Sequence, residues 1–169
     1  MKIYTLTSIQ KLPISAPQAW DFLSNPGNLK IITPDYMGFE IISGGDRPMF
    51  PGQLIQYLVT PVAGIKTKWV TEITHVKEGE YFVDEQRFGP YSLWHHKHFI
   101  KPINGGVEME DIIDYKLPFG LLGRLAHPIL VRSKLKEIFD YRREKLIELF
   151  GEFDESHNQQ KTLKQEIIN

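Results

Sequence analysis

The chain has 169 residues, a net charge of −1 and no cysteine. Its hydrophobic fraction of 41% and charged fraction of 24% are typical of a soluble globular protein, while the near-neutral charge disfavours a general nucleic-acid binder. Without cysteine there are no disulfides, no thiolate metal sites and no cysteine nucleophile. No window approaches the roughly 18 apolar residues of a membrane span. We therefore expect a cytoplasmic protein with one domain at 1–151 and a polar tail at 152–169, its oligomeric state left open.

The first part of the chain predicts one strand and two short helices. Residues 2–12 alternate between apolar and polar side chains, as a strand with one buried face does. Ser15 then offers an N-cap, and Pro17 falls in the first helical turn, where its missing N–H costs nothing. A second short helix is expected over 28–32, and Pro34 ends it.

Six further strands are expected, each separated from the next by a turn. Their ranges are 39–42, 54–59, 66–76, 81–88, the stretch from the Gly89-Pro90 turn to about 100, and 107–117. The turn at 103–106 contains Asn104-Gly105, which tolerates positive φ and suits a hairpin. Short sequential strands joined by tight turns indicate an antiparallel meander.

Residues 121–150 predict a long helix, broken near His127 by Pro128 and capped by Gly151. Apolar residues and one arginine recur at three-to-four spacing: Leu122, Leu125, Ile129, Leu135, Ile138, Phe139, Arg142, Leu146, Leu149 and Phe150. A curved antiparallel sheet needs its apolar face covered, and this helix can cover it. The fold class is therefore α+β, and a sheet that curls around one helix can leave a cavity between them.

Histidines are concentrated on the strand after Gly89-Pro90. Side chains alternate between the two faces of a strand, so Trp94, His96 and His98 share one face while His95 and Lys97 share the other. Two imidazoles spaced two residues apart can ligate a metal, given a third ligand such as Asp111. We favour a polar pocket wall instead and expect neither a metal nor a cofactor.

Asp111 is a carboxylate on an otherwise apolar strand face. A buried carboxylate is costly unless it is paired, and adjacent strands bring facing side chains within about 5 Å. We therefore expect Asp111 to pair with His96 or His98, raising the pKa of the paired histidine and lowering that of the aspartate. Such a pair could serve as a general base, or it could only orient an imidazole toward a ligand.

Other residues are candidates for the wall of the same pocket. Large aromatic side chains that we place on inward faces either fill the core or line a small-molecule site; they are Tyr57, Trp69, Trp94, Tyr115 and Phe139. Arg87 shares a strand face with Glu85, which indicates either an exposed salt bridge or a partner for a ligand carboxylate. Arg142 falls on the apolar stripe of the long helix, where it could clamp an acid against the sheet or lie solvated.

Several motifs, together with the order of the elements, resemble a known superfamily. They are the stretch Ser15-Ala16-Pro17-Gln18-Ala19-Trp20-Asp21-Phe22-Leu23 after the first strand, Phe82-Val83-Asp84-Glu85-Gln86, Gly89-Pro90-Tyr91, Trp94-His95-His96-Lys97-His98 and Asp114-Tyr115-Lys116-Leu117-Pro118-Phe119-Gly120. Over about residues 2–150 the chain resembles the SRPBCC or START-like (helix-grip) superfamily, and most of all its bacterial ligand-binding SRPBCC branch, which supplies no set of catalytic residues. The resemblance implies a hydrophobic ligand cavity between a curved sheet and the C-terminal helix, as in lipid-binding and polyketide cyclase-like members.

Three functions remain open at this stage. The first is binding of a small hydrophobic or amphipathic molecule by a carrier or sensor. The second is a cyclase, dehydratase or isomerase that uses His96, His98 and Asp111 as acid and base groups. The third is a protein-interaction domain of the chaperone-cofactor type, which an exposed apolar patch would favour. The chain has no Gly-rich phosphate loop, nucleophile elbow or zinc-protease helix.

Overall fold

The computed structural model describes residues 2–60, 65–118, 120 and 131–155. Its elements, in which η marks a 3₁₀ helix, are β1 (Tyr4–Leu12), α1 (Ala16–Leu23), η1 (Pro26–Lys30), η2 (Asp35–Met37), β2 (Glu40–Ser43), β3 (Gln53–Val59), β4 (Thr67–Lys77), β5 (Tyr81–Phe88), β6 (Leu93–Ile103), β7 (Gly106–Lys116) and α3 (Arg132–Phe150). The predicted order of strands and helices is confirmed. The single turn of η2 is an addition that the sequence pattern did not predict.

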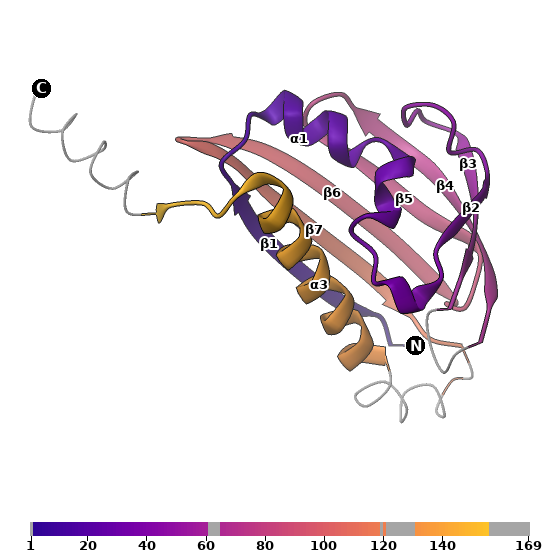
Figure 1. Cartoon of the computed structure of the whole chain (residues 1–169). Helices are drawn as coiled ribbons and strands as arrows, with labels where there is room; N and C mark the ends of the chain where they lie inside the picture. The colour runs from indigo at the N-terminus through magenta and orange to yellow at the C-terminus, as the bar shows by residue number, and fades with distance from the viewer. Residues whose placement is uncertain (1, 61–64, 119, 121–130, 156–169) are drawn as a thin grey trace, which may run out of the picture.

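The strands form one antiparallel sheet in the order β1-β7-β6-β5-β4-β3-β2. Consecutive strands from β2 to β7 are neighbours, and β1 closes the order beside β7. Figure 1 shows the curved sheet with α1 and α3 on the same face. This is the helix-grip α+β arrangement predicted from the sequence.

The connections after β1 follow from local capping. The Ser15 hydroxyl accepts a hydrogen bond from the backbone N–H of Gln18, which confirms the predicted N-cap. The next helix begins earlier than the predicted range of 28–32, because the Asn25 side chain accepts a bond from the Gly27 N–H at 2.9 Å and caps η1 at Pro26. Asn25 therefore begins the second helix, directly after Ser24, which is the C-cap of α1.

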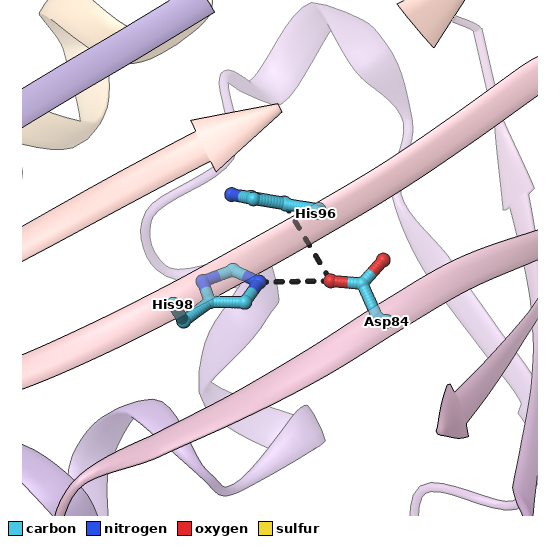
Figure 2. Close-up of side chains that lie close together, drawn as sticks. All are labelled: Asp84, His96 and His98. Carbon is cyan, nitrogen blue, oxygen red and sulfur yellow. Dashed lines mark hydrogen bonds and ion pairs between the residues drawn. The ribbon is translucent and has the colours of Figure 1, made fainter. Parts of the chain in front are cut away.

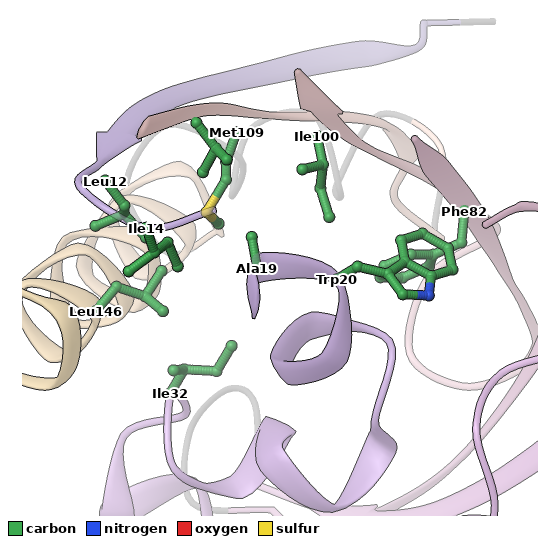
Figure 3. Packing of buried hydrophobic residues seen from close by; sticks show 10 residues of the cluster. Leu12, Ile14, Ala19, Trp20, Ile32, Phe82, Ile100, Met109 and Leu146 are labelled. Atoms are coloured by element: carbon green, nitrogen blue, oxygen red, sulfur yellow. The ribbon is translucent and has the colours of Figure 1, made fainter. Parts of the chain in front are cut away.

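The main apolar cluster lies where α1, the sheet and α3 meet. Figure 3 shows Ala19 of α1 pointing toward the sheet near Ile100 and Trp20 pointing toward Phe82, while Leu146 of α3 completes the same cluster. Leu146 is 1% exposed, and burying a side chain of this size stabilises a fold by about 1.5–3 kcal/mol. This packing holds α1 and α3 over the sheet at a spacing that leaves room for a cavity beside the cluster.

The C-terminal helix ends as predicted. The N–H of Gly151 donates to the carbonyl of Ile147 at 2.8 Å, and its φ of 91° suits glycine at the helix end. Leu149 is exposed, so the predicted stripe is wrong at that position. The predicted helical segment over 121–130, with its break near His127 and Pro128, lies outside the described residues.

Part of the predicted tail also lies outside them, at 156–169. Glu155, which is described, accepts a hydrogen bond from the Lys11 ammonium at 2.7 Å, so the first tail residues return to β1. Among the described helices, none is long and apolar enough to cross a membrane.

Candidate functional site

A cavity of about 190 Å³ lies between the sheet, α3 and the segment from α1 to η2. Apolar side chains make up most of its wall, and a small group of charged side chains comes from β5, β6 and α3. The wall consists of Phe22, Leu23, Asn28, Leu29, Ile32, Thr33, Met37, Phe39, Tyr57, Val59, Trp69, Thr71, Ile73, Phe82, Asp84, Tyr91, Trp94, His96, His98, Lys134, Leu135, Ile138, Phe139 and Arg142.

Strand alternation places the histidines on this wall. Trp94, His96 and His98 are all buried on the inner face of β6, whereas His95 and Lys97 lie on the outer face. The side-chain directions predicted for this strand are therefore those of the structure. The antiparallel register then sets Asp84 of β5 directly opposite His96.

Asp84 contacts both imidazoles through one carboxylate oxygen (Figure 2). His98 Nε2 donates a hydrogen bond to Asp84 Oδ2 at 2.8 Å, and His96 Nδ1 lies 3.5 Å from the same oxygen. The two histidine rings are 3.6 Å apart between centroids. Three side chains from two neighbouring strands thus converge on one point of the cavity wall.

Asp111 of β7 contacts the other nitrogen of each ring. His96 Nε2 donates to Asp111 Oδ1 at 3.2 Å. His98 Nδ1 lies 2.8 Å from the same oxygen, but its N–H is not aimed at it, so this contact is an ion pair without hydrogen-bond geometry. Arg142 of α3 approaches Asp111 Oδ1 at 3.2 Å. The histidines are thus held between two carboxylates, and a guanidinium neutralises the deeper one.

The two histidines differ in basicity. Burial and the charge of the neighbouring His98 lower the pKa of His96. Burial alone would lower the pKa of His98 as well, but its contacts with Asp111 and Asp84 raise it above the ordinary value. The predicted rise in pKa is therefore correct for His98 and wrong for His96, where loss of hydration and repulsion outweigh the carboxylates.

The pKa of Asp111 is lowered, as predicted. Burial alone would raise its pKa, but the charge of Arg142 and the contacts with both histidines hold it well below its ordinary value. An ionised carboxylate only accepts hydrogen bonds, so His96 must carry its proton on Nε2 to bond Asp111. The Nδ1 of a neutral His96 then presents a lone pair toward Asp84.

Aromatic packing fixes both rings. His98 stacks on Phe82 at 4.1 Å between centroids, with an interplanar angle of 18°. His96 meets Trp94 and Phe139 edge-on, each at 6.1 Å. Such contacts leave the imidazoles little freedom to rotate, so their nitrogens are preorganised toward the two carboxylates.

The structure brings most of the predicted site residues together. Those that line the cavity are Tyr57, Trp69, Trp94, His96, His98, Phe139 and Arg142. Asp111 and Tyr115 are buried but lie behind the described lining, Asp111 under the guanidinium and Tyr115 in the aromatic cluster with Trp94. The predicted inward direction of both side chains is right, but their direct place on the wall is wrong.

The prediction that Arg87 belongs to the ligand site is wrong. It lies on the outer face of β5, where its guanidinium pairs with Glu72 at 2.6 Å and with Glu85 at 3.0 Å. The exposed salt bridge considered for Arg87 is therefore what the structure shows, and its side chain is directed away from the cavity because it shares the face of Glu85. Sequence reasoning missed Asp84, whose signal was its alternation with the buried Phe82 on the same strand.

No protein-family model matches the chain, and no curated protein matches it either. Solved structures with the same architecture do match. Protein CV1439 from Chromobacterium violaceum has a TM-score of 0.64 at 12% identity, with 88% of this chain and 98% of that chain covered. Protein Ms6760 from Mycobacterium smegmatis has a TM-score of 0.62 at 16% identity, covering 88% and 96% of the two chains.

An enzyme is also among these neighbours. Norcoclaurine synthase from Thalictrum flavum, solved in complex with dopamine and hydroxybenzaldehyde, matches with a TM-score of 0.58 at 14% identity over 87% of this chain and 88% of its own. At such low identities the likeness shows the fold alone. The helix-grip fold predicted from the sequence is thereby confirmed.

Proposed function

We propose that this protein binds a small hydrophobic or amphipathic molecule in the cavity between the sheet and α3, as a carrier or sensor. The observation that carries the proposal is a cavity whose wall is mostly apolar but includes a preorganised cluster of charged groups. Small-molecule sites typically combine these two features. The volume of about 190 Å³ exceeds the roughly 150 Å³ of an apolar cavity that takes up benzene.

The lining suggests how an amphipathic ligand would be oriented. Trp69 and Trp94 meet edge-on at 5.2 Å and offer aromatic surface to an apolar group. The guanidinium of Arg142, which lines the cavity, offers N–H donors to an oxygen of the ligand. The complex of norcoclaurine synthase with dopamine and hydroxybenzaldehyde supports the view that this fold can hold small organic molecules.

The test fills the cavity from α3 and follows binding of the amphipathic dye 1-anilinonaphthalene-8-sulfonate by fluorescence. Ile138→Trp adds bulk at a lining position, and Leu149→Trp adds the same bulk at an exposed position of the same helix. We expect Ile138→Trp to weaken dye binding at least tenfold and Leu149→Trp to leave it unchanged. Native mass spectrometry of the purified wild type, followed by extraction, would identify a co-purifying ligand.

Thermal unfolding of both variants shows whether they fold. If Ile138→Trp folds like the wild type and binds the dye equally well, the dye occupies another surface and the proposal fails. Equal weakening by both substitutions would also contradict it, because Leu149 does not line the cavity.

A second candidate function is acid–base catalysis by a cyclase, dehydratase or isomerase in the same cavity. The observation that favours it is the neutral His96, whose Nδ1 lone pair lies at the cavity wall beside a second histidine of higher pKa. A base and an acid side by side suit proton abstraction and return. Incubating the extracted ligand with the wild type and with His96→Gln distinguishes catalysis from binding, because only an enzyme converts the ligand to a product of altered mass or retention.

The protein-interaction alternative has less support. It predicts a filled core beneath an exposed apolar patch, whereas the space between the sheet and α3 contains a cavity.

A further inference from the structure

Three potential metal-ligand atoms converge on one point of the cavity wall. They are Asp84 Oδ2, His96 Nδ1 and His98 Nε2, and all lie within 4.8 Å of one another. The carboxylate oxygen is 2.8 Å from the nitrogen of His98 and 3.5 Å from that of His96 (Figure 2). All three side chains line the cavity.

The two separations from the Asp84 oxygen are close to those of donors that share a metal ion. Imidazole nitrogens and carboxylate oxygens bind a first-row divalent metal at about 2.0–2.2 Å, which puts neighbouring donors about 3–3.5 Å apart. Two histidines with one carboxylate form a donor set that such metals accept with further positions left for other ligands. The i, i+2 spacing on β6 and the register with β5 bring these three donors together.

The opposite side of each imidazole is arranged as in an established metal site. A histidine that binds a metal through one nitrogen usually donates its other N–H to a carboxylate, which fixes the ring and its tautomer. Asp111 Oδ1 accepts a hydrogen bond from His96 Nε2 at 3.2 Å and lies 2.8 Å from His98 Nδ1 without hydrogen-bond geometry, so one carboxylate lies beside the remaining nitrogen of both rings. Arg142 neutralises Asp111, which lies behind the cavity lining.

Proton positions add a second argument. Because His96 donates from Nε2 to Asp111, its neutral form presents the Nδ1 lone pair to the Asp84 carboxylate at 3.5 Å. Two electron-rich atoms that face each other in a buried site are stabilised by a cation between them. Metal binding at this point also requires His98 to release the proton that its Nε2 donates to Asp84, so that the Nε2 lone pair can face the ion.

We propose that Asp84, His96 and His98 bind one divalent first-row transition-metal ion, with its remaining coordination positions directed into the cavity. Those positions would accept an oxygen or nitrogen donor of the molecule that occupies the cavity. Metal binding does not require the proposed organic ligand, because the chain itself supplies all three donors. Sequence reasoning expected no metal and considered Asp111 as the third ligand; the structure assigns that place to Asp84 and gives Asp111 the supporting role.

The test uses full-length, tag-free protein treated with a chelator and then titrated with Co²⁺ or Zn²⁺ alone. Calorimetry should give one equivalent per chain, and Co²⁺ should develop visible absorption that Zn²⁺ abolishes. Asp84→Asn keeps the shape of the side chain and should weaken metal binding more than tenfold. Removing the supporting carboxylate by Asp111→Asn should weaken it by about 10–100-fold.

A matched control lies on the outer face of the same two strands. His95 Nδ1 is 3.0 Å from Glu85 Oε1, which forms a histidine–carboxylate pair outside the cavity. His95→Gln should leave metal affinity and stoichiometry unchanged. Equal affinities of Asp84→Asn and the wild type would overturn the proposal, as would an equal loss in His95→Gln.

Folding of the variants is checked by thermal unfolding without metal. The wild type keeps the proposal falsifiable even if Asp84→Asn does not fold. If the wild type binds neither Co²⁺ nor Zn²⁺ at one equivalent near neutral pH, the donors form only a hydrogen-bonded cluster and the proposed site does not exist.

Discussion

Strands β5 and β6 carry histidines and carboxylates on both faces, and the two sets differ mainly in burial. On the outer face the side chains of Glu85 and His95 are 29% and 31% exposed. On the inner face the side chains of Asp84, His96 and His98 are 16%, 9% and 11% exposed. Similar chemical groups, one residue apart along the chain, thus form a solvated pair on one side and a closed cluster on the other.

The difference shows how burial turns the same residue types into a different kind of interaction. Water and salt screen the outer pair, so such pairs contribute about 0–1 kcal/mol. The inner groups have lost most of their hydration and must compensate one another, so removing one partner leaves an uncompensated buried charge. The inner face can therefore hold a functional site, while the outer face tolerates substitution.

The largest expected effect comes from Arg142, whose guanidinium compensates Asp111. Arg142→Met keeps an apolar stem of similar length and should lower the free energy of unfolding by about 3–5 kcal/mol. Lys136→Met is the control on the same helix, because Lys136 is an exposed partner of Asp140, and it should change stability by less than about 0.5 kcal/mol. Urea unfolding at neutral pH measures both. A loss below about 1 kcal/mol in Arg142→Met would show that Asp111 does not depend on this cation.

The next effect compares two aspartates of β7. Asp111 faces inward, whereas Asp114 faces outward and bonds Lys97 at 2.9 Å and Thr5 at 2.7 Å. Asp111→Asn should cost about 2–3 kcal/mol of unfolding free energy, because an amide replaces only part of the bonding to charged partners. Asp114→Asn should cost less than about 1 kcal/mol. Equal costs would contradict the distinction between the two faces.

The direction in which pH changes the effect of Asp111→Asn on the unfolding free energy follows from the pKa shifts of the groups involved. The pKa of Asp111 is held well below its ordinary value by Arg142 and the histidines, against the effect of burial. A depressed folded-state pKa contributes stability that is fully present above the unfolded value of about 3.9 and is lost as pH falls through the folded pKa. The difference in unfolding free energy between the wild type and Asp111→Asn, measured in chelator, should therefore rise as pH falls through the raised folded-state pKa of His98, whose charged form Asp111 stabilises, and then shrink below about pH 3.9. A difference that keeps growing below about pH 3.9 would contradict the lowered pKa of Asp111.

Much of the inner face could be predicted from alternation. The positions of Trp94, His96 and His98 follow from the two-residue period of β6, and the buried odd positions of β7 follow in the same way. The covering helix follows from its apolar stripe, because Leu135 and Leu146 are buried as predicted. These features depend on local patterns, which is why the sequence contains them.

The composition of the cluster depends on features that local patterns do not contain. The meeting of Asp84 with His96 depends on the register between β5 and β6. The position of Asp111 behind the lining depends on the approach of Arg142 from α3. The contrast in basicity between His96 and His98 depends on burial, on the charge of His98 beside His96, and on the shorter distances of His98 to both carboxylates.

The smallest expected effect concerns Arg87 on the outer face. Its guanidinium is 42% exposed and pairs with Glu72 and Glu85, so Arg87→Gln should change the free energy of unfolding by less than about 1 kcal/mol. Screening by salt should reduce even that difference, which urea unfolding at low and high ionic strength would measure. Because the guanidinium is directed away from the cavity, Arg87→Gln should also bind the anilinonaphthalene dye and Co²⁺ with wild-type affinity. A tenfold loss of either affinity, with the fold intact, would show that the outer charges reach the inner cluster and would remove the separation between the two faces.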